Sequence, residues 1–276
     1  MSAPKTHHRA LLVIDPQNDF VDPSGSLYVR GAERDAERLA RLIDSPRAEL
    51  NDLIVSLDSH HRLDISHPLW FRDAAGHPPA PFTVITSEDL RAGRWRALEG
   101  AQERTLAYLE SLEREGRYPH VIWPEHCLIG GVGQAVHPVI FEAAQGWVAR
   151  ASESSPQQIA FVSKGQNPWT EHFSAVKAEV PDPHDPHTHT RRDLIERLVG
   201  ADEVWVAGWA RSHCVANSVR DLVRFGGDAL ARKMVLVTDT MSDVPGFEEM
   251  GERFVAEARE AGVRLATSSQ LIGDGL

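Results

Sequence analysis

The sequence is poor in cysteine, with only Cys127 and Cys214 among its 276 residues. Two cysteines do not make the disulfide framework of a small secreted protein, so we expect a reducing compartment and a cytoplasmic location. Long apolar runs are also missing, since no stretch approaches the roughly 20 residues that cross a bilayer. The first ten residues lack the apolar region of a signal peptide. We therefore expect no membrane partner.

Basic residues are in deficit, with 29 Lys and Arg against 40 Asp and Glu and a net charge of −11. Nucleic-acid binding needs a basic face, so we expect no nucleic-acid partner. A content of 42% hydrophobic and 25% charged residues is ordinary for a soluble globular protein. No repeat or shift in composition marks a boundary, so we expect a single domain over residues 1–276. The sequence leaves open whether the chain forms a homo-oligomer.

Short β-branched runs alternate with amphipathic helical patterns along the chain. Most runs are apolar nearly throughout, which is typical of parallel strands covered on both faces. The alternation predicts an α/β fold with helices on both sides of a parallel sheet. The predicted strands are 9–15, 52–58, 120–124, 159–164, 203–208 and 234–239, and the predicted helices are 32–44, 98–116, 135–149, 190–199, 214–225 and 247–261.

Three reactive residues follow the carboxyl ends of predicted strands, where the ligand sites of α/β sheets lie. Asp15 ends the first strand, Lys164 ends the fourth, and Cys214 follows the fifth at the start of a helix. A helix N-terminus lowers the pKa of a thiol, and a nearby carboxylate and cation complete a nucleophile, a base and an electrostatic partner. Structural explanations also exist: a small buried thiol, an Asp that caps a turn before Pro16, and an edge lysine that extends to solvent. Cys127 is expected to be structural.

A second group of residues has the composition of a metal site. Asp58, His60 and His67 lie within ten residues, and His126 follows the third predicted strand. One carboxylate and three imidazoles suit a divalent zinc, iron or manganese ion. With 14 histidines in the chain, chance clustering is the alternative, and His61 competes with His60. Three histidines of the polar loop 181–192 are expected to be solvated surface: His184, His187 and His189.

Five segments, in order and with consistent spacing, resemble the isochorismatase-like cysteine hydrolases, and the nicotinamidases and pyrazinamidases in particular. They cover nearly the whole chain: LLVIDPQNDF, DSHHRLDISH, WPEHCLIGGVGQAVHP, SKGQNPWTEHFSAV and GWARSHCVANSVRD. The resemblance implies a three-layer α/β/α fold with a six-stranded parallel sheet of order 3-2-1-4-5-6.

The resemblance also implies an active site. Asp15, Lys164 and Cys214 would form a catalytic triad, and the N–H groups of Ala210 and Cys214 an oxyanion hole. The Trp209–Ala210 peptide bond would be cis. Two aromatic side chains, Phe20 and Trp123, would sandwich the substrate ring. One divalent metal ion would be held by Asp58, His60, His67 and His126.

The function implied is hydrolysis of a small amide to acid and ammonia through a thioester. The chain departs from the family pattern in an insertion at about 68–118, in Glu171 and His172 where Asp and Ser are usual, and in His213 where Tyr is frequent. These departures bear on the substrate and leave three alternatives. They are a related hydrolase of an acyclic amide or carbamoyl compound, a non-catalytic metal-binding or interaction protein, and a hydrolase of isochorismate, which would need neither the histidines nor the cysteine.

Overall fold

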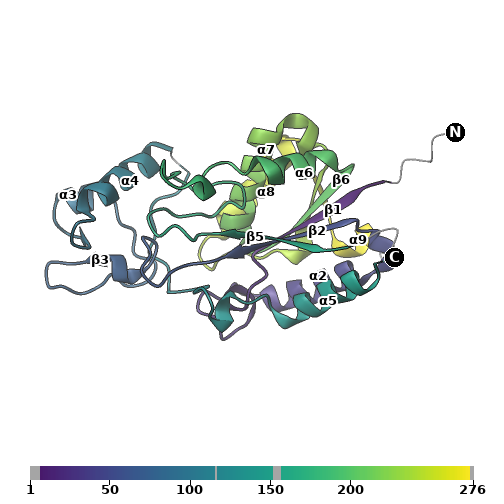
Figure 1. Cartoon of the computed structure of the whole chain (residues 1–276), viewed down its shortest axis with the longest axis horizontal. Helices are drawn as coiled ribbons and strands as arrows, with labels where there is room; N and C mark the ends of the chain where they lie inside the picture. Colours follow the sequence, from purple (N-terminus) through teal and green to yellow (C-terminus); the bar gives the residue numbers. More distant parts are fainter. Residues whose placement is uncertain (1–6, 116, 152–156, 274–276) are drawn as a thin grey trace.

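The computed structural model describes residues 7–115, 117–151 and 157–273, and residues 1–6, where we expected no signal peptide, lie outside this range. One sheet of six parallel strands forms the centre of the molecule (Figure 1). Its order is β5-β2-β1-β6-β7-β8, which is 3-2-1-4-5-6 when the strands are numbered along the chain within this sheet. The strands are Arg9–Ile14 (β1), Asp52–Asp58 (β2), Ile159–Lys164 (β5), Glu203–Gly208 (β6), Met234–Val237 (β7) and Arg264–Ala266 (β8).

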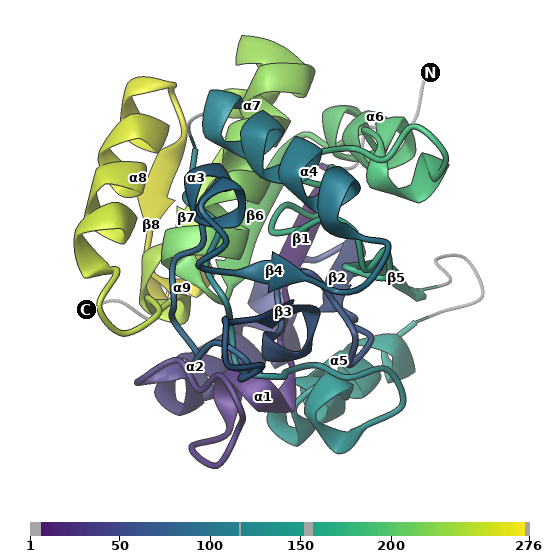
Figure 2. The same ribbon diagram turned by 90° about the vertical axis from the view of Figure 1, so that its left-hand side faces the viewer.

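Helices cover both faces of the sheet, so the expected three-layer α/β/α class is confirmed (Figures 1 and 2). Helices α2 and α5 lie on one face, and α6, α7 and α8 lie on the other. Helix α2 shows why the helices pack on the sheet. Its buried residues Ala36, Leu39, Leu42 and Ile43 recur at helical spacing and form one apolar stripe. The helices are Asn18–Val21 (α1), Ala32–Asp44 (α2), Ser87–Arg91 (α3), Gln102–Glu115 (α4), Pro138–Ala149 (α5), Arg192–Gly200 (α6), Ala216–Ala231 (α7), Glu248–Glu260 (α8) and Ser268–Ile272 (α9).

The prediction of a strand at 120–124 is wrong. This segment is extended but joins the sheet nowhere, and its Val121 makes only an isolated bridge with Val84. The segment is apolar because it is buried between two hydrophobic clusters: Val121 and Trp123 belong to the main core, and Ile122 to a smaller one. The third strand of the sheet is therefore β5, and the sixth is the short β8, which the sequence pattern did not reveal.

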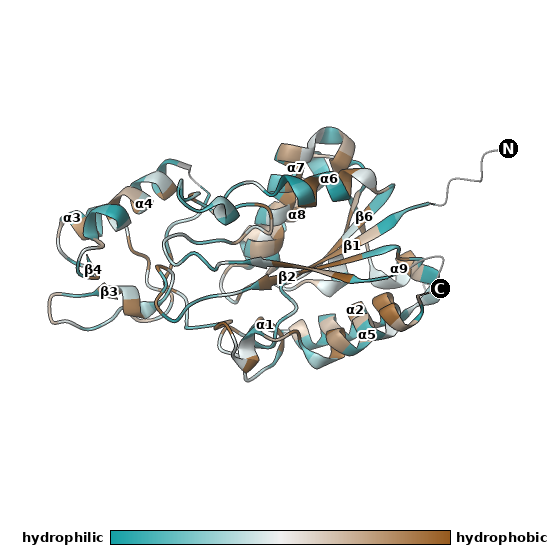
Figure 3. Cartoon of the chain, in the orientation of Figure 1, coloured by the Kyte–Doolittle hydropathy of each residue, from teal (hydrophilic) through white to brown (hydrophobic). Residues whose placement is uncertain are grey.

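The smaller cluster lies beyond the carboxyl end of the sheet, in the region where an insertion was expected. Helices α3 and α4 and the antiparallel pair Phe71–Arg72 (β3) and Arg96–Ala97 (β4) stand there, apart from the main layers (Figures 1 and 3). Their shared core contains Trp70, Phe71, Leu90, Tyr108, Leu109 and Leu112.

Apolar residues are concentrated in the central strands and in bands along the helices (Figure 3). Within the described residues, no helix is long and apolar enough to span a bilayer.

Candidate active site

The ends of three neighbouring strands bring the first functional side chains together. Lys164 and Asp58 are the last residues of β5 and β2 and pair in register, and Asp15 directly follows β1. The Lys164 ammonium lies 2.9 Å from Asp15 Oδ2 and 2.9 Å from Asp58 Oδ1, and all three side chains are buried. Because adjacent parallel strands end at one edge of a sheet, the apolar pattern of the strands places these charges next to one another.

The charges of this group depend on each other. Burial opposes the ammonium of Lys164, but the carboxylates of Asp15 and Asp58 raise its pKa well above the usual range. Burial raises the pKa of Asp15, while Lys164 acts in the opposite direction. Ser56 Oγ donates a 2.6 Å hydrogen bond to Asp15 Oδ1 and accepts one of 3.0 Å from the Asp15 N–H. Asp15 is thus a buried, oriented carboxylate with a cation beside it, as a general base requires.

Cys214 lies in a π-helical turn, Arg211–Val215, that leads into α7. Its Sγ is 3.7 Å from the Lys164 ammonium. Burial raises the pKa of the thiol well above its usual value, and Lys164 offsets this only in part. The expected lowering of this pKa by a helix N-terminus is therefore wrong, because desolvation outweighs it. Because burial raises the pKa of this thiol, a nucleophilic role calls for a base, and Asp15 is the adjacent one.

The turn before Cys214 contains the cis peptide bond that the resemblance implies. The Trp209–Ala210 peptide bond is cis, which confirms that prediction. Gly208 has a φ of 114°, and a Cβ at this position would lie 2.1 Å from the carbonyl oxygen of Ile14. Only glycine lets the end of β6 approach β1 so closely. This approach sets the Cys214 turn beside Asp15.

Three of the four predicted metal ligands form one group. Asp58 Oδ2 lies 3.1 Å from His60 Nε2 and 3.3 Å from His126 Nε2. The three ligand atoms are within 4.8 Å of one another, and all three residues are buried. His60 Nδ1 faces Asp64 Oδ2 at 3.1 Å, which is the carboxylate–histidine support that metal ligands commonly have. The donor set therefore fits a divalent ion.

His67, the fourth predicted ligand, lies beside His126. Its Nε2 lies 3.3 Å from His126 Nδ1, the nitrogen that also faces the carbonyl of Pro124 at 2.9 Å. His67 therefore contacts the nitrogen of His126 opposite to the one that faces Asp58, and the candidate group does not include it. Burial, with His126 and His60 nearby, lowers the pKa of His67 to about 3. The competing His61 is exposed, as are His184, His187 and His189, and Cys127 is fully buried.

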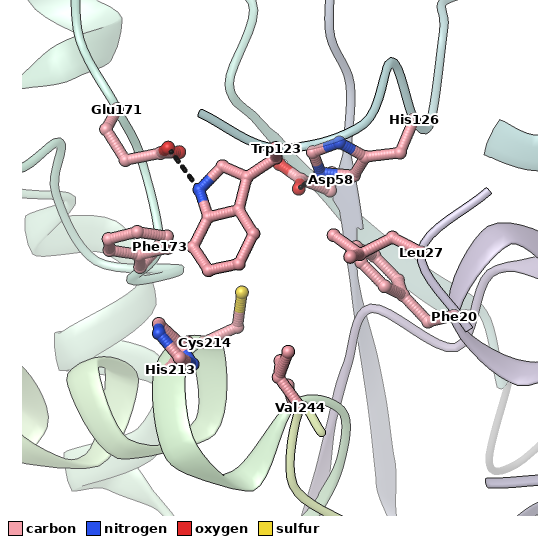
Figure 4. Close-up of a pocket in the computed structure, with 11 residues that line it drawn as sticks. Phe20, Leu27, Asp58, Trp123, His126, Glu171, Phe173, His213, Cys214 and Val244 are labelled. Carbon is pink, nitrogen blue, oxygen red and sulfur yellow. Dashed lines mark hydrogen bonds and ion pairs between the residues drawn. The ribbon is translucent and has the colours of Figure 1, made fainter. Parts of the chain in front are cut away.

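A small cavity of about 20 Å³ opens beside Cys214 (Figure 4). The thiol points toward the indole of Trp123, and Phe20 lies on another side. Asp58, His126, Glu171 and Ala210 contribute to its wall, and the remaining lining residues are Leu27, Phe173, His213 and Val244. The cavity is thus mainly aromatic and apolar, with the reactive groups at one side, which suits a small planar molecule.

Several supporting residues had not been predicted. Ser56 orients Asp15, Asp64 supports His60, and the Asp19 carboxylate accepts a 2.6 Å hydrogen bond from the Cys127 N–H, next to His126. Asp19 and Asp64 lie inside the segments that carried the resemblance, so their position in the motifs was an available signal. For Ser56 the signal in the sequence was weaker, namely that a polar residue stands inside an apolar strand.

Comparisons with known proteins agree with this geometry. No protein-family model matches the chain. A nicotinamidase of Escherichia coli is 26% identical over 220 residues, covering 79% of this chain and 78% of that protein. A nicotinamidase/pyrazinamidase of Mycobacterium tuberculosis is 26% identical over 264 residues, covering 95% and 100%. The chain is similar in sequence to nicotinamidases over most of its length.

Solved structures of nicotinamidases and pyrazinamidases share the fold. The yeast nicotinamidase bound to the inhibitor nicotinaldehyde superposes with a TM-score of 0.66 at 18% identity, covering 94% of this chain and 99% of that one. The Pyrococcus horikoshii pyrazinamidase in complex with zinc superposes with a TM-score of 0.54 at 19% identity, covering 94% and 99%. The fold of this chain is therefore the one seen in these nicotinamidase and pyrazinamidase structures.

Two departures from the nicotinamidase pattern lie in the cavity wall. His213 stacks on Tyr118 with ring centroids 5.1 Å apart and an interplanar angle of 29°. Burial, with Arg220 nearby, lowers the pKa of His213 to about 3, so the ring is neutral and serves as an aromatic surface. The second departure, Glu171, is a buried carboxyl, and burial raises its pKa to about 7.

Proposed function

We propose that this chain is a metal-containing cysteine amidohydrolase that converts a planar heteroaromatic carboxamide, nicotinamide first among them, to the acid and ammonia. One observation carries the proposal: the buried Lys164 contacts Asp15 and lies 3.7 Å from the Cys214 thiol beside an aromatic cavity. The coarser conclusion, an amidohydrolase that acts on linear carbon–nitrogen bonds, also follows from the similarity to curated nicotinamidases.

The proposed reaction has two halves. Asp15 takes the thiol proton, and Cys214 attacks the carboxamide carbon while Lys164 stabilises the negative charge. The N–H groups of Ala210 and Cys214 stabilise the tetrahedral oxyanion, a contribution of about 2.7–4 kcal/mol for one donor. The proton on Asp15 then passes to the nitrogen, ammonia leaves, and a thioester remains. Water cleaves the thioester, which yields the acid and restores the thiol.

The metal has an orienting role in this proposal. Asp58, His60 and His126 would hold it, and the ion would supply a Lewis acid for a ring nitrogen or an ordered water. Asp58 links the two groups, since its Oδ2 faces the histidines and its Oδ1 contacts Lys164.

The composition of the cavity favours a neutral ring over an acyclic acid amide. A maleamate-like substrate carries a carboxylate, for which a Lys or Arg side chain in the binding site is the usual partner. Among the described residues that line the cavity there is no Lys or Arg, and Glu171 adds a carboxyl. Phe20 and Trp123 instead offer flat surfaces, and stacking contributes about 0.5–1.5 kcal/mol beyond burial.

The remaining parts of the proposal concern the setting of the enzyme. We propose one hydrolase domain over residues 1–276 in which the insertion at about 68–118 forms part of the same body, because its core also includes Ile65 and Ile122. The proposed partner is a small amide, with no nucleic acid or membrane, and the proposed location is cytoplasmic. The net charge of −11 supports the exclusion of nucleic acid.

A substrate panel tests the function. We expect kcat/KM to be highest for nicotinamide or pyrazinamide, lower for benzamide, and lowest for maleamate. Benzamide keeps the ring but lacks its nitrogen, so a deficit for benzamide alone measures the contribution of metal coordination. Preference for maleamate over every aromatic amide would reject the nicotinamidase proposal and retain the cysteine hydrolase. Failure to release ammonia from any amide would favour the binding-protein alternative.

Metal analysis tests the proposed metal site of Asp58, His60 and His126. Elemental analysis of protein purified without chelator is expected to find one divalent ion per chain. We expect His126→Ala to remove most of the bound metal, because it deletes one of three ligands, and His67→Ala to retain most of it. Loss of metal in His67→Ala would make His67 a fourth ligand after all. His184→Ala, in an exposed loop, is the matched control.

A further inference from the structure

Glu171 is a carboxyl in the wall of the substrate cavity that the proposed reaction does not use. Its side chain is buried, with the residue 5% exposed, and it lines the cavity together with Trp123 and Cys214. Both carboxyl oxygens accept hydrogen bonds. Oε2 accepts from Trp123 Nε1 at 3.1 Å (Figure 4), and Oε1 accepts from the N–H of His172 at 3.0 Å. Burial of a carboxyl is costly, so its presence in the cavity wall calls for a role.

The bond to Glu171 defines the orientation of the Trp123 ring. The ring meets its other neighbours edge-on or tilted, with centroid distances of 6.2 Å to Phe173 and 5.2 Å to His213. Such contacts change little when a ring turns by a small angle, whereas a hydrogen bond depends steeply on direction. A buried indole N–H also needs an acceptor. Within the described part of the chain, Glu171 is the acceptor that the indole finds.

The Glu171 carboxyl also connects Trp123, in the aromatic wall of the cavity, to Lys164, the cation of the proposed triad. The backbone of His172 donates to Glu171 Oε1, and its carbonyl oxygen accepts a 3.0 Å hydrogen bond from Lys164 Nζ. Trp123, Glu171, His172 and Lys164 therefore form a continuous chain of hydrogen bonds from the cavity wall to the triad.

We propose that Glu171 is a positioning residue that, through the indole of Trp123, sets the aromatic wall at the angle to Cys214 at which a ring amide binds. This inference rests on the proposed function. It assigns specificity to Glu171, one of the positions at which the chain departs from the usual family pattern. The role of Glu171 is to orient the wall and not to move a proton, so its loss affects binding more than the chemical step.

The test is a double-mutant cycle between Glu171 and Trp123, followed as kcat and KM with the best amide of the substrate panel. Trp123→Phe keeps a flat ring but lacks the N–H. Glu171→Ala is expected to raise KM about tenfold, the upper size of one ordinary hydrogen bond, and to change kcat by less than about threefold. In the Trp123→Phe background, Glu171→Ala should add less than about twofold to KM, since the shared bond is already lost. Glu103→Ala, which removes an exposed carboxylate, is the matched control and should equal the wild type.

Two further measurements separate loss of the Glu171–Trp123 hydrogen bond from loss of the fold. The indole ¹H–¹⁵N resonance of Trp123, assigned by its absence in Trp123→Phe, should shift upfield in Glu171→Ala when the hydrogen bond is lost. Glu171→Gln keeps the shape with one acceptor oxygen and serves if the alanine variant does not fold; it should give a smaller rise in KM. An unchanged KM and resonance, or an equal rise in KM in both backgrounds, would overturn the inference. A wild type that hydrolyses no amide would instead reject the proposed function, and the resonance would still test the contact.

Discussion

Replacement of Cys214 by alanine is expected to abolish amide hydrolysis and leave the fold intact. The thiol is the nucleophile of the proposed reaction, and no other cysteine can replace it, because Cys127 is fully buried. Loss of the nucleophile of a catalytic unit costs at least about 10³-fold in kcat. Alanine is small enough for the turn, so the circular dichroism spectrum should be unchanged and Tm should move by less than about 4 °C. Ammonia release and thermal denaturation are the measurements.

Cys127→Ala is the matched control for this variant. Its Sγ has a backbone carbonyl, that of Gly133 at 4.0 Å, as its hydrogen-bond partner among the described residues, so we expect activity to be retained. Iodoacetamide should label Cys214 before Cys127, because Cys214 is 6% exposed in the cavity and has Lys164 beside it. Faster labelling of Cys127, or full activity in Cys214→Ser, would show that the nucleophile is assigned wrongly.

Replacement of Lys164 by methionine is expected to reduce both activity and stability. Lys164 is 1% exposed and contacts two buried carboxylates, so its removal leaves Asp15 and Asp58 close together without a cation between them. Loss of one partner from a buried ion pair costs about 3–5 kcal/mol in the free energy of unfolding. The catalytic loss should be at least about 10³-fold in kcat, since the negative charge on Asp15 and the thiolate would have no counterion. Denaturant unfolding and initial rates measure the two effects.

Lys177→Met provides the control for a buried lysine outside the triad. Its ammonium donates to the backbone carbonyls of Ala178 and Glu179, so we expect some loss of stability but retained kcat. The losses of Lys164→Met and Asp15→Asn should be far from additive, because triad residues act as one unit. Additive losses, or a Lys164→Met enzyme with more than a tenth of the wild-type activity, would contradict a joint role.

The metal and the triad are coupled through Asp58. Its two oxygens face different partners, with Lys164 on one and the histidines on the other. Variants of the metal group are therefore expected to reduce activity even if the ion only orients the substrate. The metal content of each variant, measured beside its kcat, separates loss of the ion from a shift of Lys164.

The sequence by itself determined the parallel sheet, its helical layers and the set of side chains at its carboxyl edge. Apolar runs at 9–15 and 52–58 bury on both faces and become inner strands, the run at 159–164 becomes a partly exposed edge strand, and the charges at their ends meet at one edge. Periodicity reports only how much of a segment is buried, so it misassigned 120–124, which is buried between two clusters outside the sheet. It also missed β8, which is three residues long and only partly buried.

Tertiary structure alone decided how the side chains face one another. The pKa of Cys214 depends on burial from all sides, which outweighs the local helix terminus that the sequence displays. His67 and His126 lie 59 residues apart, and the nitrogen through which they meet is set by loop geometry that no spacing records. Glu171 acquires its partner, the Trp123 indole, across 48 residues. Local pattern specifies which groups reach the edge of the sheet, and only packing specifies the atoms that come within hydrogen-bonding distance, because a single rotamer or loop angle changes the contact.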